Sequence, residues 1–235
     1  MREDAFNGSV ITKAQENTLL RAVYNRMMLG LFISGFTAYL ASYSAAIQQF
    51  LFGNSYMIWI LLIIELGLVF SISGGMRTMT ASTASILFVL FSFLNGLTLS
   101  FIFLVYTSVS ITTTFFITGL TFGATSFYGY ITKTDLTSWG KYLFMGLIGI
   151  IIASVVNIFV HSTTMSWVIS YIGVAVFVGL TAYDTQKIRR LGETMGAEEG
   201  SEHFGKVAIV GALALYLDFV NLFLLFLNFT GRGRN

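Results

Sequence analysis

The sequence contains no cysteine, no proline and unusually little charge. Without cysteine among its 235 residues, the chain can form no disulfide, no zinc–thiolate site and no thiol nucleophile. Without proline, any break in a helix must come from Gly, Ser or Thr. Charged residues make up 10% of the chain and hydrophobic residues 55%, whereas a soluble domain carries about 25% charge. This composition is typical of a polytopic membrane protein.

The charges that are present do not indicate nucleic-acid binding. The formal net charge is only +2, and the 13 Lys and Arg residues are scattered rather than gathered in a basic patch. We therefore expect no nucleic-acid partner. The N-terminal stretch MREDAFNGSVITKAQENTLLRAVYNR is polar throughout and does not resemble a signal peptide. We expect membrane insertion to depend on the first apolar segment.

Long apolar segments fill most of the chain. A helix needs about 20 mostly apolar residues to cross a bilayer. The sequence therefore predicts an all-α membrane protein, a bundle of seven transmembrane helices over residues 25–229, with membrane lipid around it. A tail of residues 1–24 precedes the bundle, and a short C-terminal tail of residues 230–235 follows it. The seven predicted spans are 25–47, 55–74, 82–106, 111–131, 141–161, 165–188 and 206–229.

Lys and Arg lie on one side of the predicted bundle. The N-terminal tail and the even-numbered turns carry these residues, whereas the three opposite turns, QQFLFGNS, YTSVS and HSTTM, carry none. Positively charged loops stay in the cytoplasm, so we predict a cytoplasmic N-terminus. Arg232 and Arg234 run against this rule, which leaves open whether the last segment crosses fully or dips in and returns.

The last apolar segment, which contains ALYLDFVNLFLLFLNF, has a polar side. At about 100° per residue, Gly211, Ala214, Asp218, Asn221 and Asn228 cover one face. Lipid satisfies neither a carboxylate nor an amide, and an ionised carboxylate in hydrocarbon costs about 3 kcal/mol. We therefore expect this face to point at protein or water and the last helix to lie near the middle of the bundle.

Small and polar residues also follow one face of three other segments. Such stripes let helices approach closely and bond to one another, so we interpret them as packing surfaces. They are Ser85, Ser92, Asn95 and Gly96 on the third segment, Thr114, Thr118, Thr121 and Thr125 on the fourth, and Gly146, Gly149, Ala153 and Asn157 on the fifth.

Four ionisable groups lie within or at the ends of the predicted spans: Glu65, Arg77, Asp184 and Asp218. Arg77 and Asp184 are both near the cytoplasmic side, which allows an ion pair. Asp184 and Asp218 lie on consecutive helices, and two carboxylates that come close cannot both ionise cheaply, so they titrate as one unit. Paired carboxylates also supply the oxygen ligands that calcium prefers. Asp184, Asp218 and Arg77 are thus the candidate proton-sensing site, and the two aspartates the candidate transient calcium contact.

The depth of the two aspartates is a test of this hypothesis. At 1.5 Å per residue, Asp184 is about 9 Å inside Arg190, and Asp218 is about 18 Å inside Lys206. The depths agree only if the last helix begins in the cytosol, which the polar stretch SEHFGK allows.

Each buried acid also has a purely structural interpretation. Asp218 can be a structural carboxylate that is bonded to Asn or Tyr partners. Glu65 is either an auxiliary polar group inside the membrane, together with Asn157 and Asn221, or a neutral hydrogen-bond donor between helices.

Four segments resemble the bacterial branch of the Bax inhibitor family, also called the transmembrane Bax inhibitor motif family. They are ELGLVF with the following Arg77, TSFYGYITKTDLTSWGKYLFMGLIGIIIASVVNIF, GLTAYDTQKI and ALALYLDFVNLFL. The resemblance implies seven helices with a central last helix, in the bacterial cytoplasmic (inner) membrane. It also implies a pH-sensitive calcium leak channel, without a cofactor and with calcium as the permeant ion.

The same resemblance implies roles for individual residues. An aspartate pair shares a proton in that family, and an arginine of the second helix latches one of the two. The matching positions are Asp184, Asp218 and Arg77, and the family's glutamate of the second helix matches Glu65. The chain departs from the family in its longer acidic connection, 191–206.

Two functions therefore stay open. The first is the leak channel, gated by the aspartate pair. The second is a membrane regulator without a transport role, since some bacterial relatives resemble binding partners of a membrane-anchored AAA protease. The polar N-terminal tail would serve such a contact.

Enzymatic functions are not expected. An intramembrane aspartyl protease carries a G-x-G-D element, whereas residues 215–218 read Leu-Tyr-Leu-Asp, and its proline-bearing motif is impossible here. A retinal protein needs a lysine in the last helix for its Schiff base, and none is present. His161 and His203 are far apart in predicted turns and do not indicate a metal site. No phosphate-binding glycine loop or nucleophile elbow occurs.

Overall fold

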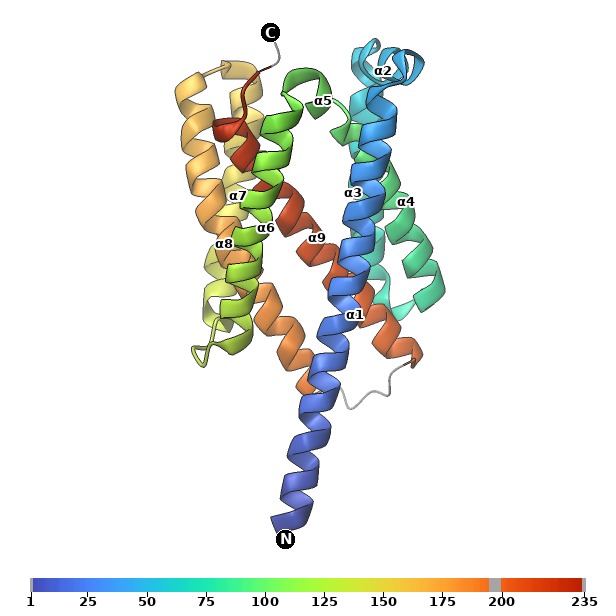
Figure 1. Cartoon of the computed structure of the whole chain (residues 1–235), viewed down its shortest axis with the longest axis vertical. Coiled ribbons are helices and arrows are strands. Elements are labelled where there is room, and N and C mark those ends of the chain that lie inside the picture. The colour runs from blue at the N-terminus through green and yellow to red at the C-terminus, as the bar shows by residue number, and fades with distance from the viewer. Residues whose placement is uncertain (1, 195–199, 234–235) are drawn as a thin grey trace. The chain divides into compact units, whose positions relative to one another are not determined.

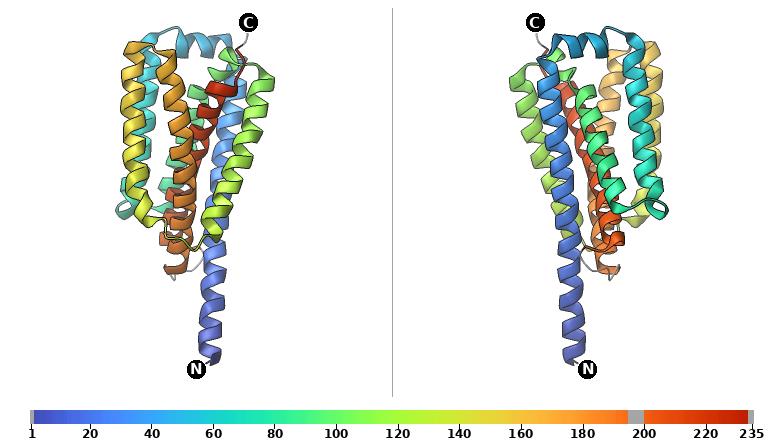
Figure 2. Two further views of the ribbon diagram at one scale, coloured as in Figure 1. Left: turned by 90° about the vertical axis from the view of Figure 1, so that its left-hand side faces the viewer. Right: turned by 90° about the vertical axis from the view of Figure 1, so that its right-hand side faces the viewer.

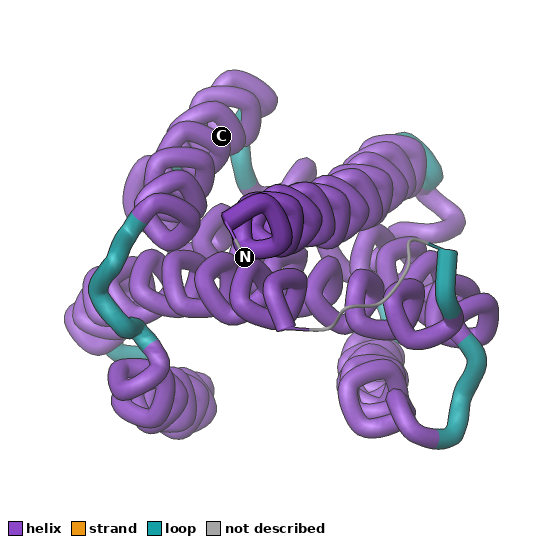
Figure 3. The backbone as a smooth tube through the Cα atoms, turned by 90° about the horizontal axis from the view of Figure 1, so that it is seen from below, coloured by secondary structure: helices purple, strands orange, loops and turns teal. Residues whose placement is uncertain are grey.

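The computed structural model describes residues 2–194 and 200–233, without the side chains of residues 2–17, Ser55 and Arg77. The described residues are almost entirely helical (Figures 1 and 3), so the predicted all-α class is confirmed. The elements are α1 (Arg2–Ser42), α2 (Ala45–Phe52), α3 (Ser55–Gly74), the 3-10 helix η1 (Gly75–Arg77), α4 (Ala81–Leu99), α5 (Ile102–Val105), α6 (Ser108–Ile131), α7 (Thr137–Val160), α8 (Thr163–Thr194) and α9 (Glu202–Thr230).

The chain divides into two compact units. The first unit contains Met1–Val105 and Ile188–Tyr216, and the second contains Tyr106–Lys187 and Leu217–Gly233. The long helices α8 and α9 therefore each contribute residues to both units.

The seven predicted spans are confirmed only in part. Within the described part of the chain, five helical stretches are long and apolar enough to cross a membrane, or six if a bent pair counts as one span. Helix α6 is not among them although it has 24 residues, because its threonines and serines lower its hydropathy. The five stretches are Tyr56–Gly74, Ala81–Val105, Thr137–Val160, Thr163–Thr194 and Glu202–Thr230, and the bent pair is Thr18–Ser42 with Ala45–Phe52.

Hydroxyl side chains mark the helix breaks, as the absence of proline led us to expect. The predicted span 25–47 is interrupted, since the chain turns by 102° between α1 and α2. There the Ser44 hydroxyl accepts a hydrogen bond from Ile47 N (3.3 Å) and caps α2. Thr80 and Thr107 cap α4 and α6 in the same way. Ser, Thr and Asn side chains satisfy the amide groups that a helix start leaves without partners.

The polar ends of the predicted bundle are more helical than expected. Helix α1 begins at Arg2, so it continues through the predicted tail of residues 1–24. Helix α8 extends to Thr194 and α9 begins at Glu202, which shortens the predicted connection 191–206. Residues 195–199 of that connection lie outside the described residues.

In the first unit, a glycine lets α1 and α4 meet closely. A Cβ atom on Gly96 would lie 2.6 Å from the Ser34 carbonyl oxygen and 2.8 Å from Thr37 Cβ, so only glycine fits there. Ser92, one turn earlier on α4, is fully buried. The stripe on the third predicted span is therefore a packing surface, which is how helices associate where lipid removes the hydrophobic driving force.

In the second unit, aromatic rings join α9 to α6. The Phe219 ring packs edge-on against the rings of Phe115 and Phe122, at 5.6 and 5.5 Å between centroids. On the threonine stripe, Thr114 and Thr118 are buried, and the Thr114 hydroxyl bonds the Thr230 hydroxyl at 2.9 Å.

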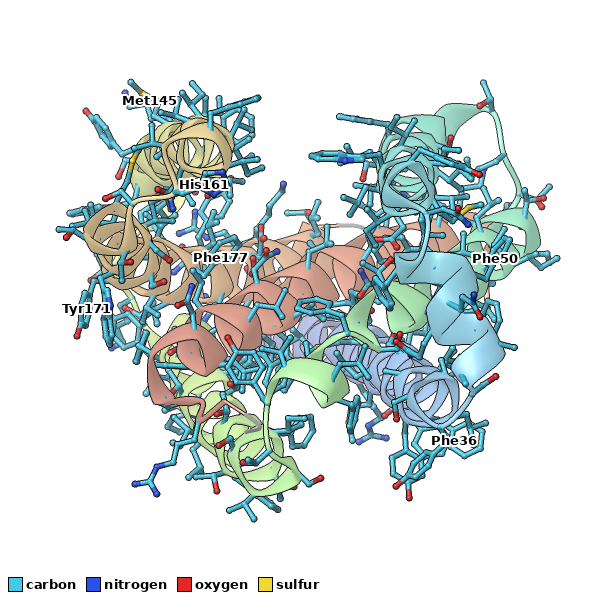
Figure 4. All side chains as sticks on the ribbon, turned by 90° about the horizontal axis from the view of Figure 1, so that it is seen from above. Phe36, Phe50, Met145, His161, Tyr171 and Phe177 are labelled. Carbon is cyan, nitrogen blue, oxygen red and sulfur yellow. The ribbon has the colours of Figure 1, made fainter. Side chains whose placement is uncertain are left out.

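Helices α7 and α8 run antiparallel and side by side in the second unit (Figure 2). Small residues again allow the approach, since a Cβ on Gly179 would lie 2.5 Å from Leu143 Cδ2. Met145 and Tyr171 point outward in Figure 4, with 66% and 60% of their surface exposed. Phe177 points inward and is 5% exposed. The outer faces of these helices are thus apolar, as contact with lipid requires.

Helix α9 is the most buried of the candidate spans. In its most apolar stretch 61% of residues are buried, against 39% for the next, Ala81–Val105. It is a continuous helix of 29 residues, about 43 Å long, whereas the hydrocarbon core is about 30 Å thick. No re-entrant break occurs in its described residues, so α9 is long enough to cross fully.

Candidate functional site

Asp184 lies in the C-terminal half of α8, in a turn whose other residues are mostly buried. The Asp184 side chain is half-buried, and its neighbours Thr181, Thr185 and Gln186 are almost inaccessible. Tyr183 packs against the first turn of α7, where a Cβ on Gly140 would lie 2.6 Å from the Tyr183 ring. These contacts fix the rotation of α8 and keep this turn away from lipid.

Asp218 lies on α9 and is only 4% exposed. Within the described part of the chain, its Oδ2 atom has no hydrogen-bond partner. Asn221, one turn later, does not supply one, because its Nδ2 donates to the Leu217 carbonyl of its own helix at 2.8 Å. A buried polar atom without a partner is costly, so the carboxylate is not explained as a satisfied structural group.

Asp184 and Asp218 both belong to the second unit. The negative charge of Asp184 acts on the Asp218 carboxyl group. Lys187, on the next turn of α8, is close enough to attract Asp184. Helix α9 begins at Glu202, inside the SEHFGK stretch and four residues before the predicted span 206–229. Two carboxylates whose charges interact ionise together less readily than either does alone.

Arg77 is the third member of the predicted site. It ends η1 in the first unit, whereas Asp184 belongs to the second. The Arg77 side chain lies outside the described residues. Its ion pair with Asp184 therefore stays a prediction.

Glu65 takes part in a separate polar cluster of the first unit. It lies in the middle of α3 and is 6% exposed. Its Oε2 accepts a hydrogen bond from Asn95 Nδ2 at 3.0 Å, and its Oε1 accepts one from the Thr98 hydroxyl, both on α4. Both oxygens accept hydrogen bonds in this arrangement, which favours the first of the two interpretations of Glu65, an auxiliary polar group between helices.

Tyr216 extends this cluster to two more helices. Its hydroxyl donates to Asn95 Oδ1 at 2.8 Å and lies 2.6 Å from the Ser34 hydroxyl of α1. Its ring is fully buried between Phe88 and Phe91, at 5.9 and 5.5 Å between centroids. The cluster of Ser34, Glu65, Asn95, Thr98 and Tyr216 thus joins α1, α3, α4 and α9. The cluster belongs to the first unit, whereas Asp184 and Asp218 belong to the second.

Asn157 and Asn221, the predicted auxiliary polar residues, bond within their own segments. Asn157 Oδ1 accepts from Ser162 N at 3.1 Å, across the turn that ends α7. That turn passes through His161, which has a left-handed backbone with φ 52° and is labelled in Figure 4. Asn157 therefore stabilises a turn that a non-glycine residue adopts at some cost. Asn221 bonds the backbone of α9, as described above.

Sequence reasoning missed Gln186, which holds the connection between α6 and α7. It is 2% exposed, its Oε1 accepts from Leu136 N, and its Nε2 donates to the Thr134 carbonyl, both at 2.8 Å. Asp184, two residues earlier, was predicted as a site residue because it is charged. The only signal for Gln186 was a neutral amide between the charged residues Asp184 and Lys187.

The described residues contain no cluster of three or more His, Asp or Glu that would hold a resident metal ion. The two aspartates offer at most four oxygens, whereas calcium takes roughly six to eight ligands, so at least a third of the ligands would have to be water or backbone oxygens. The arrangement suits brief contact with a passing cation better than tight binding.

Comparison with known proteins identifies close relatives along almost the whole chain. Inner membrane protein YbhL of Escherichia coli is 47% identical over 222 residues, which cover 94% of each chain. A protein of Borreliella burgdorferi is 46% identical over 220 residues, again 94% of each chain, and one of Rickettsia prowazekii is 42% identical over 213 residues, 91% of this chain and 89% of the relative.

The apolar helices and the inner-membrane relative establish the predicted location: the chain is an integral protein of the inner membrane. The sequence model of the family described as "Inhibitor of apoptosis-promoting Bax1" matches residues 16–235. The resemblance found in the four sequence segments is thereby confirmed. The chain belongs to the bacterial branch of the Bax inhibitor family.

Proposed function

We propose that this protein is a pH-sensitive cation leak channel that passes calcium, with Asp184 and Asp218 as its proton-responsive gate. The observation that carries the proposal is the buried Asp218 Oδ2, which has no hydrogen-bond partner among the described residues and lies within reach of the Asp184 charge. A carboxylate in that situation is rare inside a membrane and is a functional candidate by default.

The proposed gate works by charge. With one proton shared, the pair carries a single negative charge, and the two carboxyl groups attract each other through a hydrogen bond. When that proton leaves, two negative charges repel each other and favour a conformation in which a cation lies between them. Calcium is the chemically matched cation, because it is divalent and prefers carboxylate oxygens. Conduction requires that the ion also leave easily, and a site with few protein ligands allows that.

Calcium flux through reconstituted protein tests the proposal. Liposomes that hold the purified chain and a calcium-sensitive dye are expected to show influx whose rate changes with pH. Asp184→Asn and Asp218→Asn each remove one member of the pair, so each variant is expected to lose most of that pH dependence. Unchanged pH profiles in both variants would refute the gate.

Asp135→Asn is the matched control. Asp135 is an exposed carboxylate in the connection between α6 and α7, where its Oδ1 accepts from Thr137 N at 2.9 Å. An asparagine preserves that bond, so the control removes one negative charge without entering the bundle. It is expected to keep the wild-type pH profile. Arg77→Gln, in the same assay, tests the latch that the family resemblance implies.

A second function, a membrane regulator that binds a membrane-anchored AAA protease, is favoured by α1. This helix continues to Arg2, beyond the candidate span Thr18–Ser42, and the family match begins only at residue 16. Deletion of residues 2–15 is expected to abolish co-purification of such a partner and to leave calcium flux unchanged. Loss of flux in this variant would contradict a purely regulatory role for the segment. Neither proposal includes a catalytic step.

A further inference from the structure

A polar cavity of about 620 Å³ lies in the first unit, where α1, the start of α4 and the start of α9 meet. On α1 it is lined by residues between Thr18 and Arg26, a part of the helix that the distribution of Lys and Arg assigns to the cytoplasmic surface. Among its lining residues are Arg21, Asn25 and Arg26 of α1, Ser82 and Ser85 of α4, and Glu202 of α9. Neither the aspartate pair nor the Glu65 cluster contributes to it.

The cavity has an excess of positive charge. Within the described part of the chain, no carboxylate forms an ion pair with Arg21 or Arg26, and Arg26 is half-buried. Glu202 is engaged elsewhere, because its Oε1 accepts from Ala81 N at 2.6 Å and lies 3.7 Å from Lys206 Nζ. A partly buried guanidinium without a counter-ion is costly, and its planar donors match the oxygens of a phosphate group.

The helix starts around the cavity are already satisfied by the protein. Thr80 caps α4, and the Ser201 hydroxyl accepts from Phe204 N at 3.2 Å. The binding capacity of the cavity therefore comes from the two arginine side chains and the surrounding hydroxyl and amide groups.

An exposed apolar face continues from the cavity along α1. At 100° per residue, Leu29, Phe32 and Phe36 lie on the same face as Arg21 and Asn25. All three are more than half exposed, the Phe32 and Phe36 rings stack at 6.0 Å, and Phe36 points outward in Figure 4. From Asn25 to Phe36 the helix rises about 16 Å, which is close to half of the hydrocarbon thickness of about 30 Å.

We propose that this cavity binds the phosphate headgroup of an anionic phospholipid from the cytoplasmic leaflet. One acyl chain lies along Leu29, Phe32 and Phe36. A basic pocket between helices at the cytoplasmic surface is suited to such a headgroup, and the apolar face of α1 provides a surface for the acyl chain of the lipid. Free phosphate would use the arginines but not that face, so the lipid is the better match. This site is independent of the proposed channel activity.

Lipid binding to the purified full-length chain tests the proposal. Native mass spectrometry and thermal unfolding in detergent are expected to show that phosphatidylglycerol binds and stabilises the protein, whereas phosphatidylcholine does so much less. The double variant Arg21→Gln/Arg26→Gln loses two charge-assisted contacts, so its apparent Kd for phosphatidylglycerol is expected to rise about tenfold or more. Arg232→Gln removes an exposed positive charge near the C-terminus and is expected to bind like the wild type.

Three results would overturn the site. The first is equal phosphatidylglycerol binding by the double variant and the wild type, and the second is an equal loss of binding in the Arg232→Gln control. The third is stabilisation of the wild type by millimolar inorganic phosphate to the same extent as by phosphatidylglycerol, which would assign the cavity to a soluble anion. If the double variant does not fold, the comparison of the two lipids on the wild type decides, and equal stabilisation by both rejects the proposal.

Discussion

Gly129→Ala is expected to destabilise the protein strongly, although it adds one methyl group to a helix. A Cβ atom at this position of α6 would lie 2.4 Å from the Ala182 carbonyl oxygen and 2.9 Å from Ala182 Cα on α8. Both atoms belong to backbone and cannot rotate away, so the two helices must separate. Overpacking of this kind costs about 1–3 kcal/mol. In lipid the loss matters more, because close packing is what drives helices together there.

Gly123→Ala on the same helix is the matched control. Nothing lies within 4 Å of the Cβ atom that it adds. Alanine also favours a helix over glycine by about 0.5–1 kcal/mol. We therefore expect Gly123→Ala to be neutral or slightly stabilising in thermal unfolding, whereas Gly129→Ala lowers Tm by several degrees. Equal Tm values for the two variants would show that the contact between α6 and α8 is not tight.

The Gly129 contact lies close to Asp184, so the same variant reports on the gate. Ala182 precedes Asp184 by two residues on α8. A shift of α8 there would change the separation of the two carboxyl groups and hence the pH at which the proposed gate responds. A folded Gly129→Ala protein is therefore expected to show a displaced pH profile of calcium flux. Gly123→Ala is expected to keep the wild-type profile.

The sequence allowed the class of protein and its most unusual residues to be predicted, for physical reasons. A long apolar segment identifies a helix that crosses the membrane. In hydrocarbon, a single segment can pair all of its backbone N–H and C=O groups only as a helix. Lipid cannot solvate a carboxylate in such a segment. For this reason, Asp218 could be assigned to the side of the helix that faces protein. That assignment agrees with its burial.

Partners and helix breaks could not be predicted in the same way. Periodicity shows which face of a helix is polar but not which helix it meets, so the bond between Asn95 and Tyr216 had no signal in the sequence. Serine occurs both inside spans and at helix starts, so nothing distinguished Ser44, which caps a bend, from Ser92, which is buried in α4. The cavity at Arg21 and Arg26 depends on the middle of α1 and the starts of α4 and α9, which only the fold brings together.

Glu65→Leu is expected to lower the stability of the first unit by about 1–3 kcal/mol, because it leaves a buried donor without an acceptor. Asn95 Nδ2 donates to Glu65, and its Oδ1 is already occupied by Tyr216. The amide therefore cannot turn over without breaking its other bond. Thr98 is less affected, since a threonine hydroxyl on a helix can bond a carbonyl of the preceding turn. Most of the cost is expected to come from Asn95.

Glu65→Gln separates the hydrogen bonds of this residue from its charge. The glutamine oxygen can accept a hydrogen bond from Asn95, and the glutamine NH2 group can donate one to the Thr98 hydroxyl oxygen. Both contacts are therefore kept, although Thr98 changes from donor to acceptor. Thermal unfolding is expected to place this variant within about 1 kcal/mol of the wild type. A double-mutant cycle of Glu65→Leu with Asn95→Ala, each of which removes the bond between the two residues, should give a coupling of about 0.6–1.7 kcal/mol. If the Glu65 cluster only joins helices, Glu65→Gln also keeps the pH profile of calcium flux. A profile as flat as that of Asp218→Asn would instead place Glu65 in the ion pathway and require a second proton-responsive site in the first unit.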